Sequence, residues 1–208
     1  MAISIQPATR DDIEALSRLQ LDAMSSDYAW RQIFRDADAD DNLRLAIKQN
    51  LDMLTRSGRS LTRAIRGQDD EPIAMALDAL YDAANDEPGP EPELPAGANT
   101  RLAEAFFPIF DDCLKYAKER DGRFYHLTVL AVAPRVQRSG AGKALLQAFV
   151  DKADAANLPC YLESTEAGQG LYAKYGFVPY RGVARCTLDE EMSVLPMRRP
   201  AKSEVGAK

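Results

Sequence analysis

The chain has 208 residues, of which 46% are hydrophobic and 28% are charged, and its formal net charge is −6. This length and composition predict a single globular domain over residues 1–208. The acidic balance disfavours nucleic acid as a partner. No apolar run is long enough to cross a bilayer and no secretory pattern is present, so we expect no membrane partner and a cytoplasmic location.

The few cysteines and histidines limit the kinds of site that the chain can build. Cys113, Cys160 and Cys186 show neither paired nor metal-type spacing, and His126 is the single histidine. Zinc sites need several such ligands at short intervals. We therefore expect reduced cysteines and no metal.

The first part of the chain predicts a strand, two helices and a pair of strands. Residues 3–7 alternate as a strand does, and apolar residues then recur at helical spacing up to residue 24 and again over residues 40–57. Residues 60–66 and 72–81 predict two strands joined by a polar turn. The proline- and acid-rich stretch 82–100 predicts a surface loop, and whether it gates an acceptor site is left open.

The second part predicts helices alternating with strands. A helix is expected over residues 100–120, with a kink or restart at Pro108. A buried strand over 124–133, a helix over 140–157 and a strand over 158–164 form a parallel strand-helix-strand unit. A short helix before Gly176, strands over 177–187 and 192–198, and a frayed tail from residue 201 complete the prediction.

The segment from Leu127 to Leu146 is the most informative, because it predicts a strand, a turn and a glycine-bearing helix start. The first N–H groups of a helix lack partners within the helix and form an anion site. A P-loop is excluded, since Ala144 follows Gly142-Lys143 and Gln137 stands at the first glycine position. A dinucleotide fingerprint fails at its third glycine, where Leu145 stands.

Two motifs in this half resemble one family. Gln137-Arg-Ser-Gly-Ala-Gly142 fits the pattern Gln/Arg-x-x-Gly-x-Gly/Ala, and Leu171-Tyr-Ala-Lys-Tyr-Gly-Phe177 follows in the expected order. Both are similar to motifs of the Gcn5-related N-acetyltransferase (GNAT) superfamily. The resemblance in motif covers roughly residues 127–180.

This resemblance implies a mixed α/β fold and a cofactor. The expected fold is a mixed, mostly antiparallel sheet of about seven strands with a splayed parallel pair, flanked by about four helices. The expected co-substrate is acetyl-CoA, bound through glycine-exposed backbone and nearby cations. The candidate cofactor-binding residues are Leu130, Ala131, Val132, Gln137, Arg138, Ser139, Gly140, Ala141, Gly142, Lys143 and Thr165.

Family position also implies two catalytic side chains. Tyr172 is the expected acid that protonates the leaving thiolate, because an ordinary tyrosine pKa of about 10 keeps it protonated at neutral pH. His126 falls where some members carry a glutamate base, and a histidine suits the deprotonation of an ammonium. Glu163 and water remain as alternative bases. Thr165 and Gly168 depart from a common asparagine and a common alanine of the family, which puts the asparagine's contact with the cofactor in doubt.

The activity expected from the resemblance is acetyl transfer from acetyl-CoA to a primary amine, directly within a ternary complex. A non-catalytic acyl-CoA-binding sensor of the same fold is the alternative. Small-molecule and peptide amines both remain open as acceptors, because the segments that shape the acceptor site carry no motif. By analogy with the fold that the resemblance implies, two copies of the chain can pair through their late strands, so a homodimer is a possible assembly.

Overall fold

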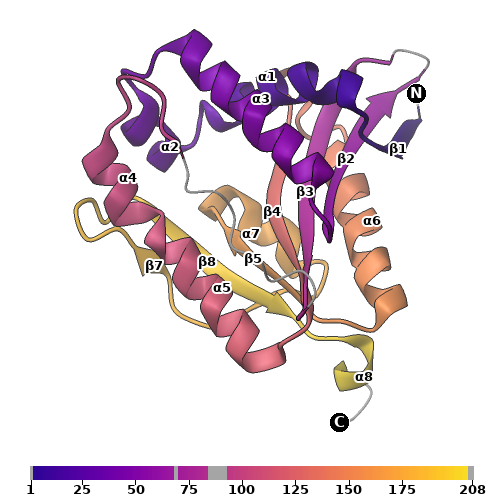
Figure 1. Cartoon of the computed structure of the whole chain (residues 1–208). Coiled ribbons are helices and arrows are strands. Elements are labelled where there is room, and N and C mark those ends of the chain that lie inside the picture. The colour runs from indigo at the N-terminus through magenta and orange to yellow at the C-terminus, as the bar shows by residue number, and fades with distance from the viewer. Residues whose placement is uncertain (1, 68–69, 84–92, 206–208) are drawn as a thin grey trace.

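The computed structural model describes residues 2–67, 70–83 and 93–205, and its centre is an eight-stranded mixed sheet (Figure 1). The strand order is β1-β2-β3-β4-β5-β8-β6, and β7 pairs with β8. The β4–β5 pair is parallel and the other pairs are antiparallel. The strands are β1 (Ile3–Pro7), β2 (Arg59–Arg66), β3 (Pro72–Tyr81), β4 (Phe124–Val132), β5 (Cys160–Ser164), β6 (Val178–Pro179), β7 (Ala184–Arg185) and β8 (Ser193–Arg199). The predicted mixed, mostly antiparallel fold is confirmed.

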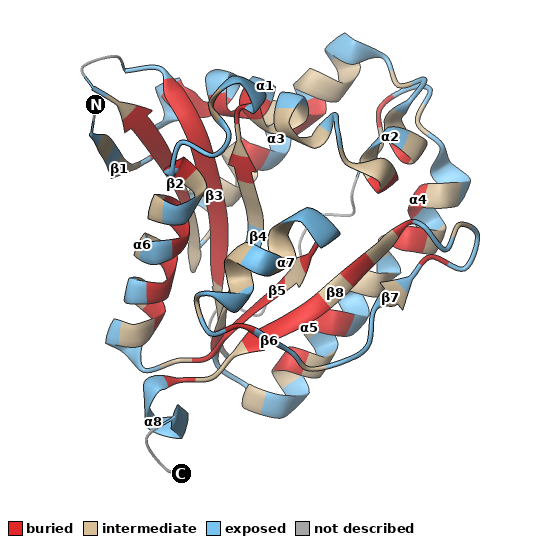
Figure 2. Ribbon diagram, turned by 180° about the vertical axis from the view of Figure 1, so that it is seen from behind, coloured by how far each residue is buried: buried red, intermediate tan, exposed pale blue. Residues whose placement is uncertain are grey.

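Helices cover both faces of the sheet. The α-helices are α1 (Ile13–Met24), α2 (Tyr28–Phe34), α3 (Ala39–Thr55), α4 (Thr100–Phe106), α5 (Pro108–Asp121), α6 (Ala141–Ala156), α7 (Glu166–Ala173) and α8 (Lys202–Val205). Figure 2 shows α6 and α7 on one face, whereas α1, α3 and α5 lie on the other (Figure 1). The helices outnumber the expected four, because several short ones join the long ones.

Local sequence explains where the main helices begin. At the start of the turn that leads into α1, the Thr9 N–H and hydroxyl both donate to Asp12 Oδ2, at 2.7 and 2.9 Å. The predicted break at Pro108 is confirmed, since this proline is the first residue of α5. Proline is tolerated there because the first helical N–H has no partner within the helix.

The core lies on both sides of the sheet. On one side, the apolar face of α6 packs on β2, β3 and β4, with Leu145, Leu146 and Phe149 at its centre. On the other side, α1 and α3 cover the same strands, and Leu16 and Met75 are fully buried there. Both faces of β3 and β4 are therefore covered, which explains their nearly continuous apolar sequence.

Three predictions about the chain's periphery need correction. Residues 28–34 form the unpredicted helix α2, and the strand expected over 177–187 is reduced to the two-residue strands β6 and β7. The tail was expected to fray from residue 201, but residues 202–205 form α8. Glu204 accepts hydrogen bonds from Arg198 at 2.8 and 2.9 Å, and this contact holds α8 against β8. Residues 206–208 lie outside the described residues.

The predicted loop over 82–100 is described only in part. Residues 84–92, the middle of the loop that was considered as a gate for the acceptor site, lie outside the described residues. The end of the loop is bound to α2 and α3: the Ala96 N–H donates to Asp41 Oδ2 at 2.8 Å, and the Asn99 N–H donates to Ile33 O at 2.7 Å. Over the described part of the chain, no helix is long and apolar enough to cross a membrane.

Candidate active site

A fork in the sheet marks the candidate site. The parallel pairing of β4 with β5 joins Tyr125 with Cys160 and His126 with Tyr161, and it ends there. Both strands nevertheless continue, β4 to Val132 and β5 to Ser164. Figure 1 shows the two strands diverging beyond this point. The splayed pair that the resemblance implied is therefore present.

A β-bulge lies at the base of the fork. On β3 and β4, Leu77 pairs with Val129 and Asp78 pairs with Leu127, so Thr128 is an extra residue of β4. Such a bulge reverses the alternation of side chains along the strand that carries it. Leu127 before the bulge and Leu130 after it consequently both pack toward α6.

The backbone beyond the bulge has groups free to bind a ligand. The Ala133 N–H donates to Ile73 O at 3.0 Å, toward β3. Because alternate residues of a strand direct their backbone groups to opposite sides, Ala131 also faces β3. Leu130 and Val132 then direct their N–H and C=O groups into the fork. Of the three candidates on β4, these two are the ones placed to bind through backbone.

The start of α6 forms an open cradle beside the fork. Gly140 caps this helix with φ +96°, and Arg138 also has a positive φ of 62°. No side chain of the described residues caps the helix, and residues 137–140 are exposed. A Cβ on Gly142 would lie 3.1 Å from Val132 Cγ2, so the glycine lets α6 approach β4 closely. The N–H groups of Gln137 and Ser139 donate within the turn, to Pro134 O and Val136 O, so the first N–H groups of α6 are the ones that can receive an anion.

The cradle and the start of α7 carry exposed side chains that could bind a ligand. Arg138 and Lys143 are exposed, and neither forms an ion pair with another described residue. Thr165 is the exposed N-cap residue of α7, and its side chain makes no capping bond. These side chains are therefore available to a ligand.

Tyr172 lies on the α6 side of the sheet. Its ring packs against the α6 cluster and contacts Phe177 edge-on, with 5.9 Å between ring centroids. A Cβ on Gly168 would lie 2.7 Å from Tyr172 Cε2, so the ring occupies the space of an alanine methyl at that position. Burial raises the pKa of the Tyr172 hydroxyl to about 12. The hydroxyl is consequently a proton donor at neutral pH.

His126 and Glu163 form a buried pair across the base of the fork. The distance from His126 Nε2 to Glu163 Oε2 is 2.9 Å, and their side chains are 11% and 4% exposed. The other ring nitrogen, Nδ1, lies 3.2 Å from Thr128 Oγ1. The histidine and the carboxylate, considered from sequence as rival bases, are thus hydrogen-bonded partners.

This pair faces the α5 side of the sheet, where its neighbours were not predicted. The Tyr81 ring lies edge-on to His126 at 6.2 Å and packs in a cluster with Leu114 of α5. Burial raises the pKa of the Cys113 thiol to about 11, and the charge of Glu163 adds to this effect. Burial also raises the pKa of Tyr180. The Tyr180 hydroxyl is buried and has no hydrogen-bond partner among the described residues.

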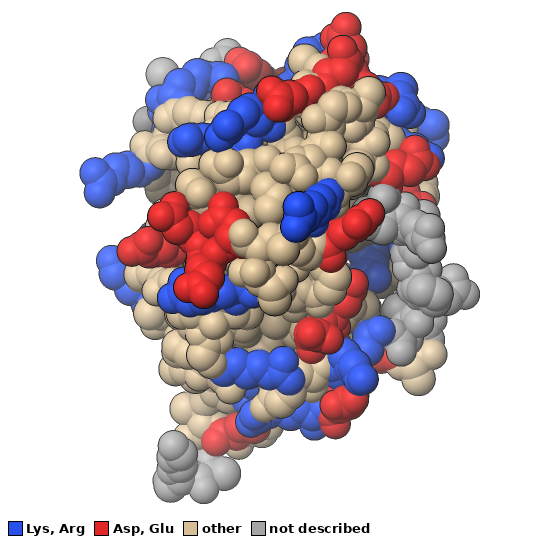
Figure 3. Space-filling view, turned by 90° about the vertical axis from the view of Figure 1, so that its left-hand side faces the viewer, with Lys and Arg blue, Asp and Glu red and all other residues tan. Residues whose placement is uncertain are grey.

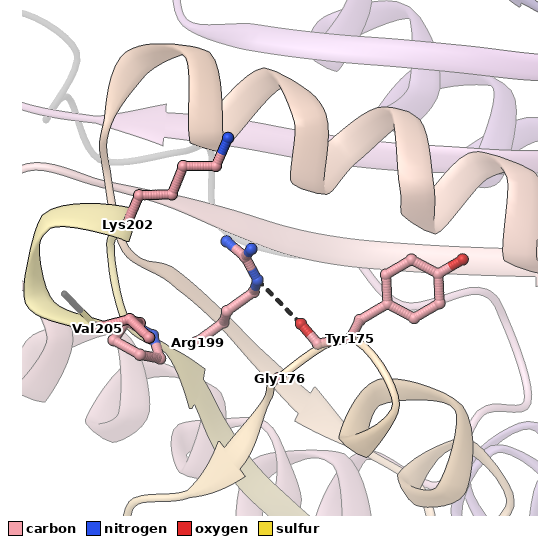
Figure 4. A pocket seen from close by; sticks show the side chains of 6 residues that line it. Tyr175, Gly176, Arg199, Lys202 and Val205 are labelled. Atoms are coloured by element: carbon pink, nitrogen blue, oxygen red, sulfur yellow. Dashed lines mark hydrogen bonds between the residues drawn. The ribbon is translucent and has the colours of Figure 1, made fainter.

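A cavity of about 420 Å³ lies apart from the fork residues, between Tyr175, Gly176, Arg199, Lys202 and their neighbours (Figure 4). Arg199 Nε donates to Tyr175 O at 2.9 Å, which the dashed line in Figure 4 marks. The Tyr175 hydroxyl donates to Lys143 O at 3.2 Å, toward α6. Both tyrosine rings pack against the α6 cluster, but the Tyr175 hydroxyl is bonded to the backbone of α6.

Comparisons with known proteins agree with this geometry. Residues 113–199 match the family model of the acetyltransferase (GNAT) domain. The fold resembles a protein of Corynebacterium glutamicum described as histone acetyltransferase HPA2 and related acetyltransferase, at 19% identity and TM-score 0.64 over 97% of each chain. It also resembles the Escherichia coli ribosomal-protein-S18-alanine N-acetyltransferase, at 16% identity and TM-score 0.58 over 96% of this chain and 94% of that one.

A third similar structure is the PaiA N-acetyltransferase of Thermoplasma acidophilum in complex with coenzyme A. It is 14% identical, with TM-score 0.54 over 96% of this chain and 99% of that one. The comparison with curated protein sequences finds no match. The matched domain spans the fork, the α6 cradle and Tyr172, and the fold is that of the GNAT acetyltransferases. The resemblance to the GNAT superfamily is thereby confirmed.

Proposed function

We propose that the protein transfers an acetyl group from acetyl-CoA to a primary amine, directly within a ternary complex. The observation that carries this proposal is the placement of the two candidate catalytic side chains. Tyr172 packs on the α6 face and the His126–Glu163 pair faces α5, and both lie beside strands that separate at the fork. A thioester and an amine that approach from opposite faces could therefore meet at the fork.

The donor is assigned to the α6 face. The cradle from Gln137 to Lys143 would hold the pyrophosphate through backbone N–H groups, and Arg138 would add a positive charge. The backbone of Leu130 and Val132 would bind the pantetheine arm as a neighbouring strand does. The coenzyme A complex of the Thermoplasma acidophilum enzyme supports this choice of cofactor. Among the described residues, no group of three or more metal-ligating side chains is placed to hold a metal ion.

Proton transfer is assigned to the two sides of the fork. The amine must lose a proton before or during attack on the carbonyl, and the leaving thiolate must gain one. The His126–Glu163 pair would accept the first proton, and the Tyr172 hydroxyl would supply the second. Backbone N–H groups at the fork would polarise the carbonyl. None of these steps requires a covalent enzyme intermediate.

The acceptor is assigned only as a primary amine. The Escherichia coli enzyme is described by its acceptor, an alanine of a ribosomal protein, which supports an amine for this chain. On the side where α4 lies in Figure 1, Lys and Arg alternate with Asp and Glu around an uncharged area (Figure 3). This mixed surface gives no preference for a strongly charged acceptor.

Release of free thiol from acetyl-CoA in the presence of single amines, small and peptide, tests the proposal. We expect release with at least one amine, and Tyr172→Phe should lower kcat by about 100-fold with coenzyme A affinity unchanged. Tyr175→Phe is the matched control and should keep its activity. Tight binding of acetyl-CoA without release for any amine would instead favour the alternative, a non-catalytic sensor.

A further inference from the structure

The acceptor amine has no direct access to the lone pair of His126. The residue is only 9% exposed, and both of its ring nitrogens have hydrogen-bond partners. One partner is the Glu163 carboxylate and the other is the Thr128 hydroxyl. A base in this position needs an intermediary that reaches the ligand.

The hydrogen bonds decide which nitrogen can take a proton. An ionised carboxylate only accepts hydrogen bonds, so Nε2 must carry the hydrogen that points to Glu163. In the neutral ring, Nδ1 then holds the lone pair. Thr128 Oγ1 is therefore the donor to Nδ1, and the proton acceptor of the pair faces the threonine.

Thr128 stands where a ligand can touch it. It is the extra residue of the β-bulge, it is exposed, and it lies two residues beyond the last pairing of β4 with β5. A hydroxyl that donates one hydrogen bond can still accept another. The bulge thus brings one polar atom to the surface of the fork and connects it to the buried pair.

We propose that Thr128 is a catalytic residue that relays the proton of the acceptor amine to His126, with Glu163 stabilising the charged ring. The inference rests on the proposed acetyl transfer. The amine nitrogen gives one proton to Thr128 Oγ1 as the Thr128 hydroxyl proton moves to His126 Nδ1. The threonine ends unchanged, the amine has lost a proton and the imidazole has gained one. The imidazolium later returns this proton to water.

The groups around the pair do not compete for this proton. The titratable groups that face it are Tyr81 on β3, Cys113 on α5 and Tyr180 after β6, and Arg181 in turn interacts with Cys113 and Tyr180. Burial raises the pKa of the Cys113 thiol to about 11 and also raises the pKa of the Tyr180 hydroxyl. Both therefore stay neutral near pH 7.

The variants Thr128→Val and Thr128→Ser test the relay. Valine keeps the branched shape that suits a strand and removes the hydroxyl, whereas serine keeps the hydroxyl. With an amine that the wild type acetylates, we expect Thr128→Val to lower kcat by about 100-fold and Thr128→Ser to restore most of it. Coenzyme A affinity should not change in either variant.

The pH profile and a combined variant separate this role from a structural one. The limb of kcat/KM that His126→Gln abolishes should also vanish in Thr128→Val. The combined variant should be no slower than either single one, because the two residues act as a unit. A Thr128→Val variant with wild-type kcat and an unchanged pH limb would overturn the relay. So would acetylation of Thr128 by acetyl-CoA without an amine, which would make it a nucleophile instead.

The single histidine offers a readout that is independent of turnover. Since the chain contains one histidine, its imidazole ¹⁵N resonances belong to His126 without assignment. We expect the neutral ring to carry hydrogen on Nε2, and Thr128→Val to shift the Nδ1 resonance. Hydrogen on Nδ1 in the wild type would overturn the relay even if the enzyme is active. A wild type that acetylates no amine but shows the expected tautomer would count against the proposed function, not against this geometry.

Discussion

The position of the Tyr172 ring depends on the absence of a side chain one helical turn earlier. A Cβ on Gly168 would lie 2.7 Å from Tyr172 Cε2 and 3.0 Å from Ser164 Oγ. Gly168→Ala therefore introduces a methyl group that overlaps the edge of the Tyr172 ring, without removing any polar group. We expect this substitution to damage activity more than stability.

The size of both effects follows from the contact distances. Carbon atoms pack at about 3.5–4.0 Å, so the ring edge must move by roughly 1 Å. Overpacking of this kind costs about 1–3 kcal/mol. Alanine returns up to about 1 kcal/mol because it favours the helix more than glycine does. The net loss of stability should thus be about 0–2 kcal/mol if the helix returns the full amount, and no more than about 3 kcal/mol if it returns none. A catalytic group displaced by about 1 Å can by contrast cost about 100-fold in rate.

Gly170 of the same helix provides the matched control. A Cβ there would meet no atom within 4 Å. Gly170→Ala should raise the melting temperature slightly and leave thiol release unchanged. Gly168→Ala should lower kcat by about 100-fold and add little to Tyr172→Phe, since both act through one hydroxyl. Wild-type kcat in Gly168→Ala would refute a catalytic role for the position of this ring.

Three other substitutions or treatments test the surrounding structure. Lys152→Met should lower the free energy of unfolding by about 3 kcal/mol, because it leaves the buried Asp78 carboxylate without its partner. Adding Asp78→Asn to this variant should recover most of the loss in a denaturant titration. A double variant in which the two losses add would contradict this. Hydrogen bonds from Arg198 lower the pKa of Glu204. Their contribution to the free energy of unfolding is therefore complete above the ordinary pKa of 4.5 and is lost as pH falls through the lowered value. Glu204→Gln should therefore destabilise the protein at pH 7 and not at about pH 2, a difference that melting curves at the two pH values would detect. Burial raises the pKa of Cys160 to about 12, so iodoacetamide at pH 7.5 should not label it in the native protein, and rapid labelling by mass spectrometry would refute this burial.

The sequence predicted the long elements because each has its own periodicity or punctuation. The apolar stripe of α6 and the restart at Pro108 are examples, and both are confirmed. The helix α2 has only seven residues, too few for a helical stripe to recur. The polar composition of residues 201–208 predicted a frayed tail, but residues 202–205 form α8. The hydrogen bond from Arg198 to Glu204 holds this helix, and composition does not reveal such a contact.

The site could be predicted only where a motif encodes it. The cradle at the start of α6 follows from glycine spacing, and the positive φ of Gly140 agrees with that choice of residue. The contact between His126 and Glu163 joins residues 37 positions apart, and it depends on the register of a parallel pair. Thr128 left one signal, a polar residue within an apolar strand, but no pattern showed that it is an added residue.

In the proposed function, the bulge lets the single strand β4 contact one substrate through side chains and the other through its backbone. Ahead of it, β4 offers side chains to the α5 face, where His126 meets Glu163. Behind it, the same strand keeps Leu130 packed toward α6 and turns its backbone to the fork. A regular pleat would rotate the second half so that Leu130 faced the opposite side. If the proposed function holds, one inserted residue separates the part of β4 that acts through side chains from the part that binds the cofactor through its main chain.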